Sequence, residues 1–368
     1  MKKPRENAPG RSSGKKDRRT PSNASSLPPK GASQSAPLSE STPASSPVEA
    51  MVPQASAAPR PVAPSSPQFN TDAPPVTLRT IRGMVDQNVP FACLTCYDAT
   101  TARWLERAGV PILLVGDTAA EVILGFKRTL DMPLDVLIAL TAGVKRGAPR
   151  SLVMGDMPFL SYHTSEADAI RNAGRFVVEG MADIVKVEAT SAEAPRLGVM
   201  ARAGIPLCGH VGCRPQQAAV AGGYVAAGRT VRELEKVVDD AVALEQAGCV
   251  MLLVEAVPDE VSRAILQRTS LPLIGIGAGP SCHGQVLVLQ DLLGLSDTPP
   301  RFAEPVASLG VELEKAGREW VRRVAERRIG GRGYSMRAGE AERLRNQNHP
   351  ADGLIEEIVR PGRRERGP

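Results

Sequence analysis

The feature that most restricts the fold of this chain is a regular alternation of short apolar runs with segments of helical periodicity. The alternation begins at Val76. We predict strands near residues 90–96, 111–117, 151–156, 183–189, 205–211, 249–256, 271–277 and 286–290. Strand–helix units in strict alternation form a parallel sheet with helices outside it. Eight such units in about 220 residues match the size of a (β/α)8 barrel, the fold class that we predict.

The main alternative is an open, doubly wound sheet, which carries phosphate-binding glycines directly after its first strand. The segment after the first predicted strand, "CYDATTARW", contains no glycine. A later segment, "GIGAG" (Gly275–Gly279), is followed by Pro280 where the GxGxxG fingerprint needs its third glycine. We therefore interpret "GIGAG" as a close-packed strand end that lines a pocket in a barrel.

The residue types at the ends of the helical segments are those expected of helix termini. Thr100 or Thr101 should cap the helix after the first strand, and Ser165 should cap the helix in "EADAIRNAGRFVVEG". Glycine commonly follows the last turn of a helix because it adopts the left-handed conformation at little cost. Three glycines are expected to close helices in this way: Gly109, Gly180 and Gly248.

Composition divides the chain into three parts. Residues 1–75 are rich in Pro, Ser, Ala and basic residues and contain hardly any large apolar side chain. Such a segment cannot bury enough surface to fold, so we expect a disordered tail. Residues 76–330 should form the barrel with its terminal helices, and residues 331–368 should be a loosely ordered C-terminal tail.

The positive charge of the chain belongs to the N-terminal tail. Residues 1–30 contain nine Lys or Arg and two Asp or Glu, a net charge of +7, whereas the other 338 residues together carry −2. The barrel therefore need not bind polyanions. A solvated extension is favoured over a nucleic-acid-binding arm, because no aromatic residue stands among the basic ones, and only a weak tail contact with nucleic acid is left open.

The sequence predicts a cytoplasmic protein. No apolar run reaches the length that spans a bilayer, and no apolar stretch typical of a signal peptide follows the basic N-terminus. Six cysteines are present, and Cys93 and Cys96 form a single CxxC. Without a second pair at metal spacing, we expect these two thiols to lie on opposite faces of one strand, as buried residues of a reduced protein.

Polar residues stand at or near the ends of five apolar runs: Asp117, Asp156, Lys186 with Glu188, His210, and Glu255. One of them, "SLVMGDMPF", ends a buried strand on an ionisable carboxylate, which is costly without a partner. Any single residue could be a helix cap or a structural side chain. In a barrel, however, all of them meet at the C-terminal face, where active sites lie. Acidic residues there, without a Cys/His ligand set, suit Mg²⁺.

At this point the sequence resembles a known family. The segments "LLVGDT", "VKRGAP", "GDMPFLSY", "DIVKVEA", "IPLCGHVG", "GGYVAAGR", "LLVEAVP" and "PLIGIGAG" match ketopantoate hydroxymethyltransferases in order and spacing, from about Thr77 to Phe302. The resemblance implies a (β/α)8 barrel of the phosphoenolpyruvate mutase/isocitrate lyase type and a homo-oligomer. It also implies transfer of a hydroxymethyl group from 5,10-methylenetetrahydrofolate to 3-methyl-2-oxobutanoate, a 2-oxo acid, in pantothenate synthesis.

The resemblance also implies a role for each polar residue. Asp117 and Asp156 would hold Mg²⁺ and contact substrate, and Glu188 would complete the metal site. Glu255 would be the catalytic base. Three further residues would contact the substrate: Thr118, Lys186 (at the carboxylate) and His210.

These roles are chemically coherent. A 2-oxo acid can chelate Mg²⁺ through its carboxylate and keto oxygens, and the metal then stabilises the developing enolate. Glu255 would remove the proton on C3, and the enolate would attack the one-carbon unit, whose reactivity is supplied by the folate.

Several positions depart from the family pattern. Ala119 and Ala120 replace a Leu-Gly pair, and Ala120 would be strained if that glycine needs a positive φ. "TLDMP" replaces "TLPVT" in a loop over the predicted pocket. Three further family residues are replaced, at Leu140, His283 and Gln290. The pattern fits a divergent active enzyme, a paralogue with another 2-oxo acid or acceptor, or an impaired paralogue.

Two functions of other classes are kept as alternatives. A lyase or mutase of the phosphoenolpyruvate mutase type would use the same metal and enolate chemistry, but the chain lacks a nucleophilic Cys in a lyase-type loop and contains "GHVG" and "GGY". A non-catalytic barrel would bind a partner through its basic tail. The joint presence of Asp117, Asp156, Glu188 and Glu255 argues against it.

Overall fold

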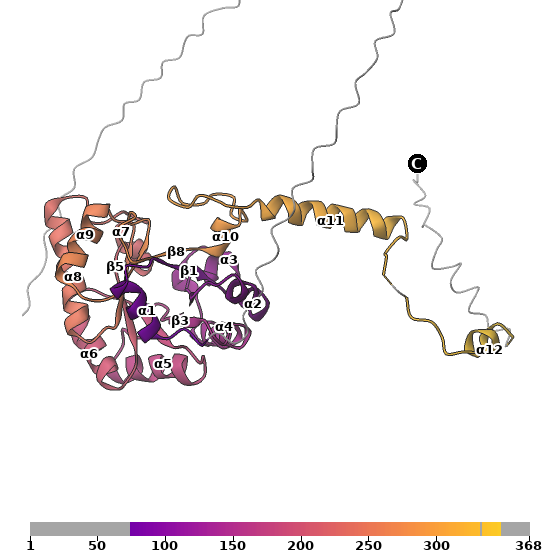
Figure 1. Ribbon diagram of the computed structural model, residues 1–368, viewed down its shortest axis with the longest axis horizontal. Helices are drawn as coiled ribbons and strands as arrows, with labels where there is room; N and C mark the ends of the chain where they lie inside the picture. Colours follow the sequence, from indigo (N-terminus) through magenta and orange to yellow (C-terminus); the bar gives the residue numbers. More distant parts are fainter. Residues whose placement is uncertain (1–73, 332, 347–368) are drawn as a thin grey trace, which may run out of the picture. The chain divides into compact units, whose positions relative to one another are not determined.

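A computed structural model describes residues 74–331 and 333–346 (Figure 1). Eight parallel strands form a closed barrel in sequence order, and β8 pairs with β1 to close it. The strands are β1 (Phe91–Thr95), β2 (Ile112–Val115), β3 (Leu152–Asp156), β4 (Ile184–Glu188), β5 (Leu207–Gly212), β6 (Met251–Glu255), β7 (Leu273–Ile276) and β8 (Gly284–Leu287). The predicted (β/α)8 barrel is confirmed, and the open sheet is wrong.

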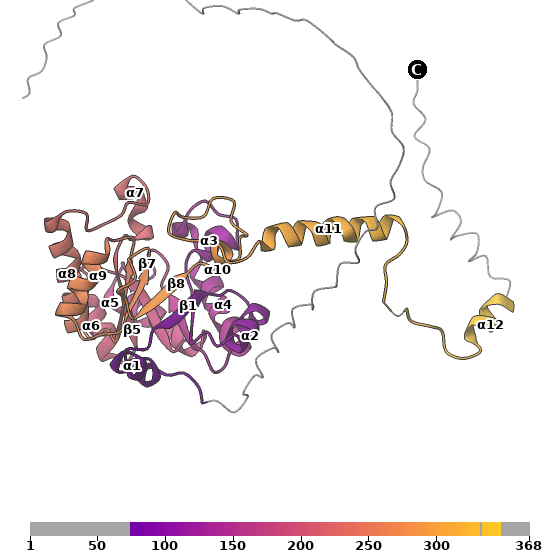
Figure 2. The same ribbon diagram turned by 45° about the horizontal axis from the view of Figure 1, so that its top comes forward.

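Helices follow the first six strands and cover the barrel from outside (Figure 2). Their bounds, with those of two short 3-10 helices, are α1 (Leu78–Asp86), α2 (Ala99–Arg107), α3 (Ala119–Val122), η1 (Thr129–Asp131), α4 (Leu134–Gly147), α5 (Glu166–Val178), α6 (Ala194–Arg202), η2 (Pro215–Gln217), α7 (Ala218–Ala221), α8 (Val231–Gln246), α9 (Asp259–Arg268), α10 (Leu289–Leu292), α11 (Leu309–Ala325) and α12 (Glu340–Asn346). None of these described helices has the length and apolarity needed to cross a membrane.

Two apolar clusters make up the core, one inside the barrel and one between the strands and the outer helices. They are separate because successive residues of a strand point to opposite faces. Cys93 belongs to the inner cluster and Cys96 to the outer one, which confirms the prediction for the CxxC. All six cysteines are buried and free. Ile81 of α1 is fully buried against Phe91, so α1 closes the N-terminal end of the barrel.

The helix ends agree with the predicted boundaries but not with every predicted residue. Ser165 caps α5 as expected, whereas α2 is capped by Asp98. Asp98 Oδ1 accepts 2.8 Å hydrogen bonds from the backbone N–H groups of Thr100 and Thr101, the two residues that we predicted as caps. A carboxylate is well suited to this position because it also faces the positive end of the helix dipole.

The residues that close the helices also differ in one place from the prediction. Gly109 and Gly248 have positive φ, as predicted. Gly180 does not take a left-handed backbone, and Met181 adopts it instead, with φ 54°.

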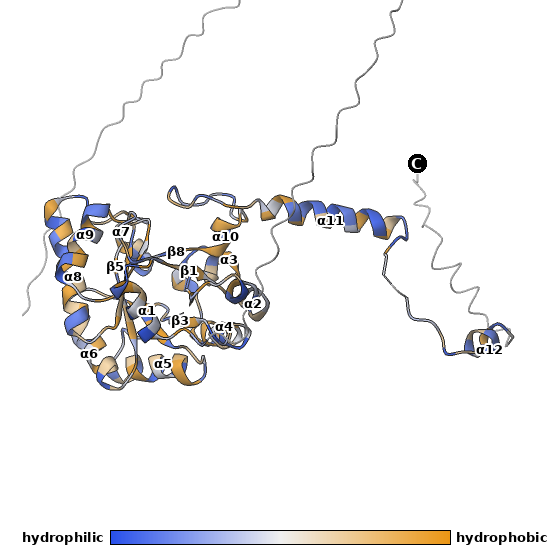
Figure 3. Ribbon diagram, viewed as in Figure 1, coloured by the Kyte–Doolittle hydropathy of each residue, from blue (hydrophilic) through white to orange (hydrophobic). Residues whose placement is uncertain are grey.

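The long helix α11 has no buried residue. Four of its apolar side chains recur at helical spacing on one face, Leu309, Leu313, Trp320 and Val324, with exposed fractions from 36% to 56%. The helix carries hydrophilic and hydrophobic residues side by side along its length (Figure 3). These four residues are called the α11 stripe below.

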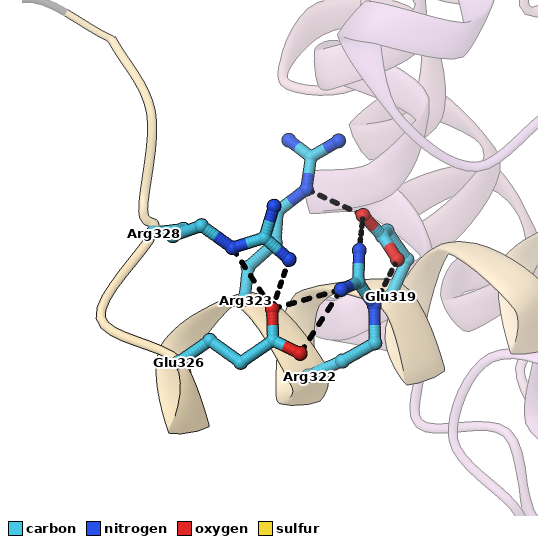
Figure 4. A network of polar contacts seen from close by, with 5 residues as sticks. All are labelled: Glu319, Arg322, Arg323, Glu326 and Arg328. Carbon is cyan, nitrogen blue, oxygen red and sulfur yellow. Dashed lines mark hydrogen bonds and ion pairs between the residues drawn. The ribbon is translucent and has the colours of Figure 1, made fainter.

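Near its C-terminal end, α11 carries a network of exposed ion pairs (Figure 4). Glu319 pairs with Arg322 at 2.8 Å and with Arg323 at 2.7 Å, and Glu326 pairs with Arg322 and Arg328. Exposed pairs of this kind contribute little to stability, about 0–1 kcal/mol each. The network therefore identifies the solvated face of α11 and not a binding site.

One sector of the barrel wall lacks a helix. No helix stands between β7 and β8, and β8 is followed only by the four-residue α10. On the outward faces of β1 and β8, Ala92 and Gln285 are exposed, and Leu94 and Leu287 are partly exposed.

The two predicted tails lie mostly outside the described residues. Residues 1–73 of the expected disordered tail and residues 347–368 of the C-terminal tail are not among them. Within the segment that we predicted to be loosely ordered, α12 forms a short helix.

Candidate active site

The alternation of side chains along the strands carries the polar residues into the barrel. In β3 to β6 the inward positions are apolar near the N-terminal ends, where Leu152, Ile184, Cys208 and Met251 belong to the inner cluster. Two or four residues further along, the same faces present polar side chains. These are Asp156 on β3, Lys186 and Glu188 on β4, His210 on β5 and Glu255 on β6.

The register of the barrel then places these residues side by side. Asp156 is the pairing partner of Lys186, and Glu188 is the partner of His210. Asp117 joins them from the loop after β2, where its backbone N–H donates a 3.2 Å hydrogen bond to Asp156 Oδ2. The convergence predicted from the sequence is therefore present in the structure.

A cavity of about 1020 Å³ opens at this face. Six of the seven predicted site residues line it: Asp117, Thr118, Asp156, Lys186, His210 and Glu255. Glu188, which is 4% exposed, is not among the residues that line it. Four residues that we did not predict as site residues also line the cavity: Glu121 of α3, Tyr224 of the loop after β5, and Arg301 and Phe302 of the segment after α10.

Lys186 is the buried cation of the site. Its Nζ lies 2.6 Å from Asp156 Oδ2, and both side chains are almost completely buried. Burial alone would lower the pKa of Lys186, but the carboxylates of Asp156, Asp117 and Glu188 outweigh it and raise that pKa above its ordinary value. Lys186 is therefore an ammonium ion at all physiological pH values.

The carboxylates exceed the cation in number, and their proton affinities reflect this excess. Burial, followed by the charge of Asp156, raises the pKa of Asp117 to about 8. Burial and the charge of Asp117 raise the pKa of Glu188 well above its usual range. Asp156 Oδ1 and Glu188 Oε1 are buried and accept no hydrogen bond from any described residue. Such unsatisfied acceptors are rare in folded proteins and indicate a site that binds a cation or a donor.

The three acids predicted as metal ligands do not form a ready-made cluster. Among residues 74–331 and 333–346, no three His, Cys, Asp or Glu side chains are placed to share one ion. The contacts explain the difference, because Asp156 is drawn to Lys186 and Asp117 accepts a 3.0 Å hydrogen bond from Gln216. Their oxygen-only chemistry still fits Mg²⁺, which binds one or two carboxylates and completes its shell with water and substrate oxygens.

His210 stands between two acids. Its Nε2 lies 3.2 Å from Glu255 Oε2, and its Nδ1 lies 3.6 Å from Glu188 Oε1. Neither ring nitrogen makes a well-formed hydrogen bond within the described part of the chain. Burial, and then the nearby charge of Lys186, lowers the pKa of His210, so the ring is neutral at pH 7.

The backbone of β5 approaches the backbone of β6 closely at Glu255. Glu255 ends β6, its side chain is 20% exposed to the cavity, and Ala256 turns away with φ 49°. Its neighbour in β5, Gly212, has φ +93°, and a Cβ there would meet the carbonyl oxygen of Glu255 at 2.5 Å. Only glycine fits at position 212, and the position of Glu255 depends on it.

The positions that depart from the family pattern disturb the site less than the sequence suggested. Ala119 and Ala120 begin α3 with right-handed backbone, so the strain that we considered for Ala120 is absent. Leu140 packs against the outer cluster, and His283 Nδ1 accepts a hydrogen bond from the backbone N–H of Leu273. Gln290, like these two, is not part of the cavity wall.

The "GIGAG" segment behaves as predicted. Ile276 lines the cavity, and Gly277 and Gly279 take positive φ. A Cβ on Gly277 would overlap the ring of Phe302, and one on Gly279 would overlap Asp259. The glycines therefore serve close packing at the end of β7.

Known proteins resemble this chain over the whole barrel. The family model for ketopantoate hydroxymethyltransferase matches residues 75–331. A 3-methyl-2-oxobutanoate hydroxymethyltransferase from Hyperthermus butylicus is 40% identical over 271 residues, which are 73% of this chain and 94% of that protein. One from Heliobacterium modesticaldum is 42% identical over 252 residues, covering 68% of this chain and 91% of that protein.

Solved structures of lower sequence identity are also similar. A putative phosphonomutase from Burkholderia cenocepacia has a TM-score of 0.48 at 16% identity and covers 67% of this chain and 99% of its own. A 2,3-dimethylmalate lyase, a member of the PEP mutase/isocitrate lyase superfamily, has a TM-score of 0.46 at 17% identity, covering 78% of this chain and 100% of its own.

Proposed function

This chain belongs to the ketopantoate hydroxymethyltransferase family, and we propose that it transfers a hydroxymethyl group from 5,10-methylenetetrahydrofolate to 3-methyl-2-oxobutanoate, giving 2-dehydropantoate for pantothenate synthesis. The observation that carries the proposal is the convergence of Asp117, Asp156, Lys186, His210 and Glu255 on one cavity. A cavity of about 1020 Å³ is at the upper end of the usual range for small-molecule sites, which supports the presence of two reactants.

The proposed metal ligands are Asp117 and Asp156, which line the cavity, and Glu188, which does not line it. When bound, Mg²⁺ supplies Lewis-acid stabilisation of negative charge on oxygen. The open oxygens Asp156 Oδ1 and Glu188 Oε1 support this assignment. Oxygens of water and of the 2-oxo acid would provide the rest of the shell.

The remaining residues act on the 2-oxo acid. The ammonium of Lys186 attracts the substrate carboxylate and fixes its direction, and Thr118 offers a hydroxyl at the same wall. Glu255 is the base that accepts the proton from C3. His210, neutral and 3.2 Å from Glu255 Oε2, can donate a hydrogen bond to that carboxylate and hold its direction.

Proton exchange without the folate tests the proposal. With the full chain and Mg²⁺ in D₂O, we expect the C3 proton signal of 3-methyl-2-oxobutanoate to disappear from the proton NMR spectrum. The loss should stop with excess EDTA and resume when Mg²⁺ is restored. Exchange that is equally fast with EDTA would contradict the metal assignment, and no exchange at all would contradict the enolising role.

We also propose that the chain forms a homo-oligomer through the α11 stripe. An apolar helix face of this kind normally packs against another surface. The partly apolar outer faces of β1 and β8 lack a helix, so each copy carries both an unpartnered helix and an uncovered sector. The occupant that we propose for that sector is α11 of a second copy.

Light scattering on the full chain tests this assembly. The protein should have a mass greater than one chain, and the double variant Leu313→Glu/Trp320→Glu should fall to the mass of one chain. Arg318→Ala, on the opposite face of α11 where it pairs with Glu314, should keep the wild-type mass. A wild-type protein of single-chain mass, or a double variant that still assembles, would overturn the proposal.

A further inference from the structure

Gln216 joins three parts of the active site, although no local sequence pattern marks it as a site residue. It lies in η2 and is 2% exposed. Its side-chain Nε2 donates to Asp117 Oδ2 at 3.0 Å and to the Met157 carbonyl at 2.9 Å. Its backbone N–H donates to Glu188 Oε2 at 3.1 Å. One residue of the loop after β5 thus holds carboxylates that follow β2 and end β4.

The direction of the Gln216 amide is fixed by its surroundings. The hydroxyl of Tyr162 lies 2.9 Å from Gln216 Oε1 and 2.9 Å from the Glu188 carbonyl oxygen, and it can donate its proton to either of these acceptors. If the amide were turned over, Oε1 would face Asp117 Oδ2 and the Met157 carbonyl, which are both acceptors. Both N–H groups and the carbonyl of the amide are therefore used in a single orientation.

In Glu188 and in Asp156, one carboxylate oxygen accepts hydrogen bonds and the other accepts none from the described residues. Glu188 Oε2 is held by Gln216, whereas Glu188 Oε1 has no hydrogen-bond partner among the described residues. Asp156 shows the same arrangement, with Oδ2 held by Lys186 and Oδ1 open. A carboxylate with one oxygen held and the other open is oriented for a ligand before the ligand arrives.

We propose that Gln216 is a positioning residue that holds Asp117 and Glu188 in the orientation needed to bind a divalent cation. The inference rests on the proposed function, because it assigns the cation to the same site. It adds a residue from the loop after β5, supported from behind by Tyr162. Loss of the Gln216 amide should weaken cation binding even when the protein stays folded, because Asp117 then loses the donor that fixes its direction. The loop also loses its side-chain bond to the Met157 carbonyl, which helps to hold the backbone N–H of residue 216 against Glu188 Oε2.

Calorimetric titration of the full chain with Mg²⁺ alone tests the proposal. Gln216→Met keeps the size of the side chain and removes the amide, and we expect Mg²⁺ to bind about 10–100-fold more weakly. Tyr162→Phe removes the hydroxyl that lies 2.9 Å from both Gln216 Oε1 and the Glu188 carbonyl oxygen, and should give an intermediate loss, with the same sign. Gln217→Met is the matched control, because Gln217 makes no hydrogen bond to the acids, and should bind as the wild type does.

The melting temperature of the metal-free variants separates positioning from simple support of the fold. A structural role would lower the melting temperature of Gln216→Met and leave the Mg²⁺ affinity of the folded protein unchanged, which would overturn the inference. Equal Mg²⁺ affinity in wild type, Gln216→Met and Tyr162→Phe would also overturn it. A wild type that binds no Mg²⁺ would instead refute the metal site of the proposed function, so the two failures are distinguishable.

Discussion

Replacing Lys186 with methionine is expected to lower the free energy of unfolding of the metal-free protein by about 3–5 kcal/mol at pH 8. Lys186 is the ammonium partner of Asp156 in a buried pair, at 2.6 Å. Its charge also lowers the pKa of Asp117 and of Glu188, although burial keeps both raised overall. Methionine fills a similar volume without the charge, so the variant buries several carboxylates without a compensating cation.

The loss in free energy of unfolding caused by Lys186→Met should increase at alkaline pH. The folded pKa of Asp117 is about 8, above its value in the unfolded chain, so the folded state binds more protons. The contribution of Asp117 to stability is therefore fully present below its unfolded pKa and is lost as the pH rises through about 8. Without Lys186 this pKa rises further. The stability gap between variant and wild type should therefore widen as the pH rises above about 8, where Asp117 ionises in the folded wild type but stays protonated in the folded variant.

Urea unfolding in EDTA at pH 8 and at about pH 9.5 measures both effects. Lys236→Met is the matched control, because Lys236 pairs with Asp240 at 3.2 Å but its side chain is 66% exposed. It should cost less than about 1 kcal/mol at either pH. A Lys186→Met protein as stable as wild type at pH 8 would show that the acids are not ionised in the folded chain.

The second large effect is expected for Glu255→Gln, which should slow the exchange of the C3 proton by about 10²–10⁴-fold. Glutamine has the same shape and still fits beside His210, so the cavity should keep its form. Only the capacity to accept a proton is lost. Glu255→Asp, which retains a carboxylate but shortens the side chain, should keep part of the activity.

Deuterium incorporation at C3, followed by proton NMR with Mg²⁺ and a saturating concentration of 3-methyl-2-oxobutanoate, gives the rates. The expected order is wild type, then Glu255→Asp, then Glu255→Gln. The Mg²⁺ affinity of Glu255→Gln should stay near that of wild type, because Glu255 is not a proposed metal ligand. Undiminished exchange in Glu255→Gln would assign the base to another residue.

Much of the fold was predictable because two periodicities coincide in this sequence. Apolar runs of strand length alternate with helical segments, and in β3 to β6 the inward face changes from apolar to polar toward the C-terminal end. Met154 followed by Asp156, and Ile184 followed by Lys186, therefore placed the charged residues at one end of the barrel before any contact was known. The same alternation correctly placed Cys93 and Cys96 on opposite faces of the barrel wall.

The rest depended on contacts between segments that are distant in the sequence. Gln216 stands 99 residues from Asp117, and no local pattern distinguishes it from Gln217. Glu188 has the same inward spacing as Lys186, yet only Lys186 lines the cavity, a difference that alternation alone cannot predict. The cap of α2 was missed because Asp98 and the two threonines after it are all good capping residues, and only the backbone angles of Asp98 decide between them.

The complete reaction is the best test of the proposed hydroxymethyl transfer. The full chain is incubated with 3-methyl-2-oxobutanoate, 5,10-methylenetetrahydrofolate and Mg²⁺, and the products are identified by mass spectrometry. We expect a 2-oxo acid that has gained one hydroxymethyl group, formed together with free tetrahydrofolate and absent with Glu255→Gln. If the C3 proton exchanges but no hydroxymethyl product forms, the cavity enolises a 2-oxo acid for a different acceptor, and the proposed transfer is wrong.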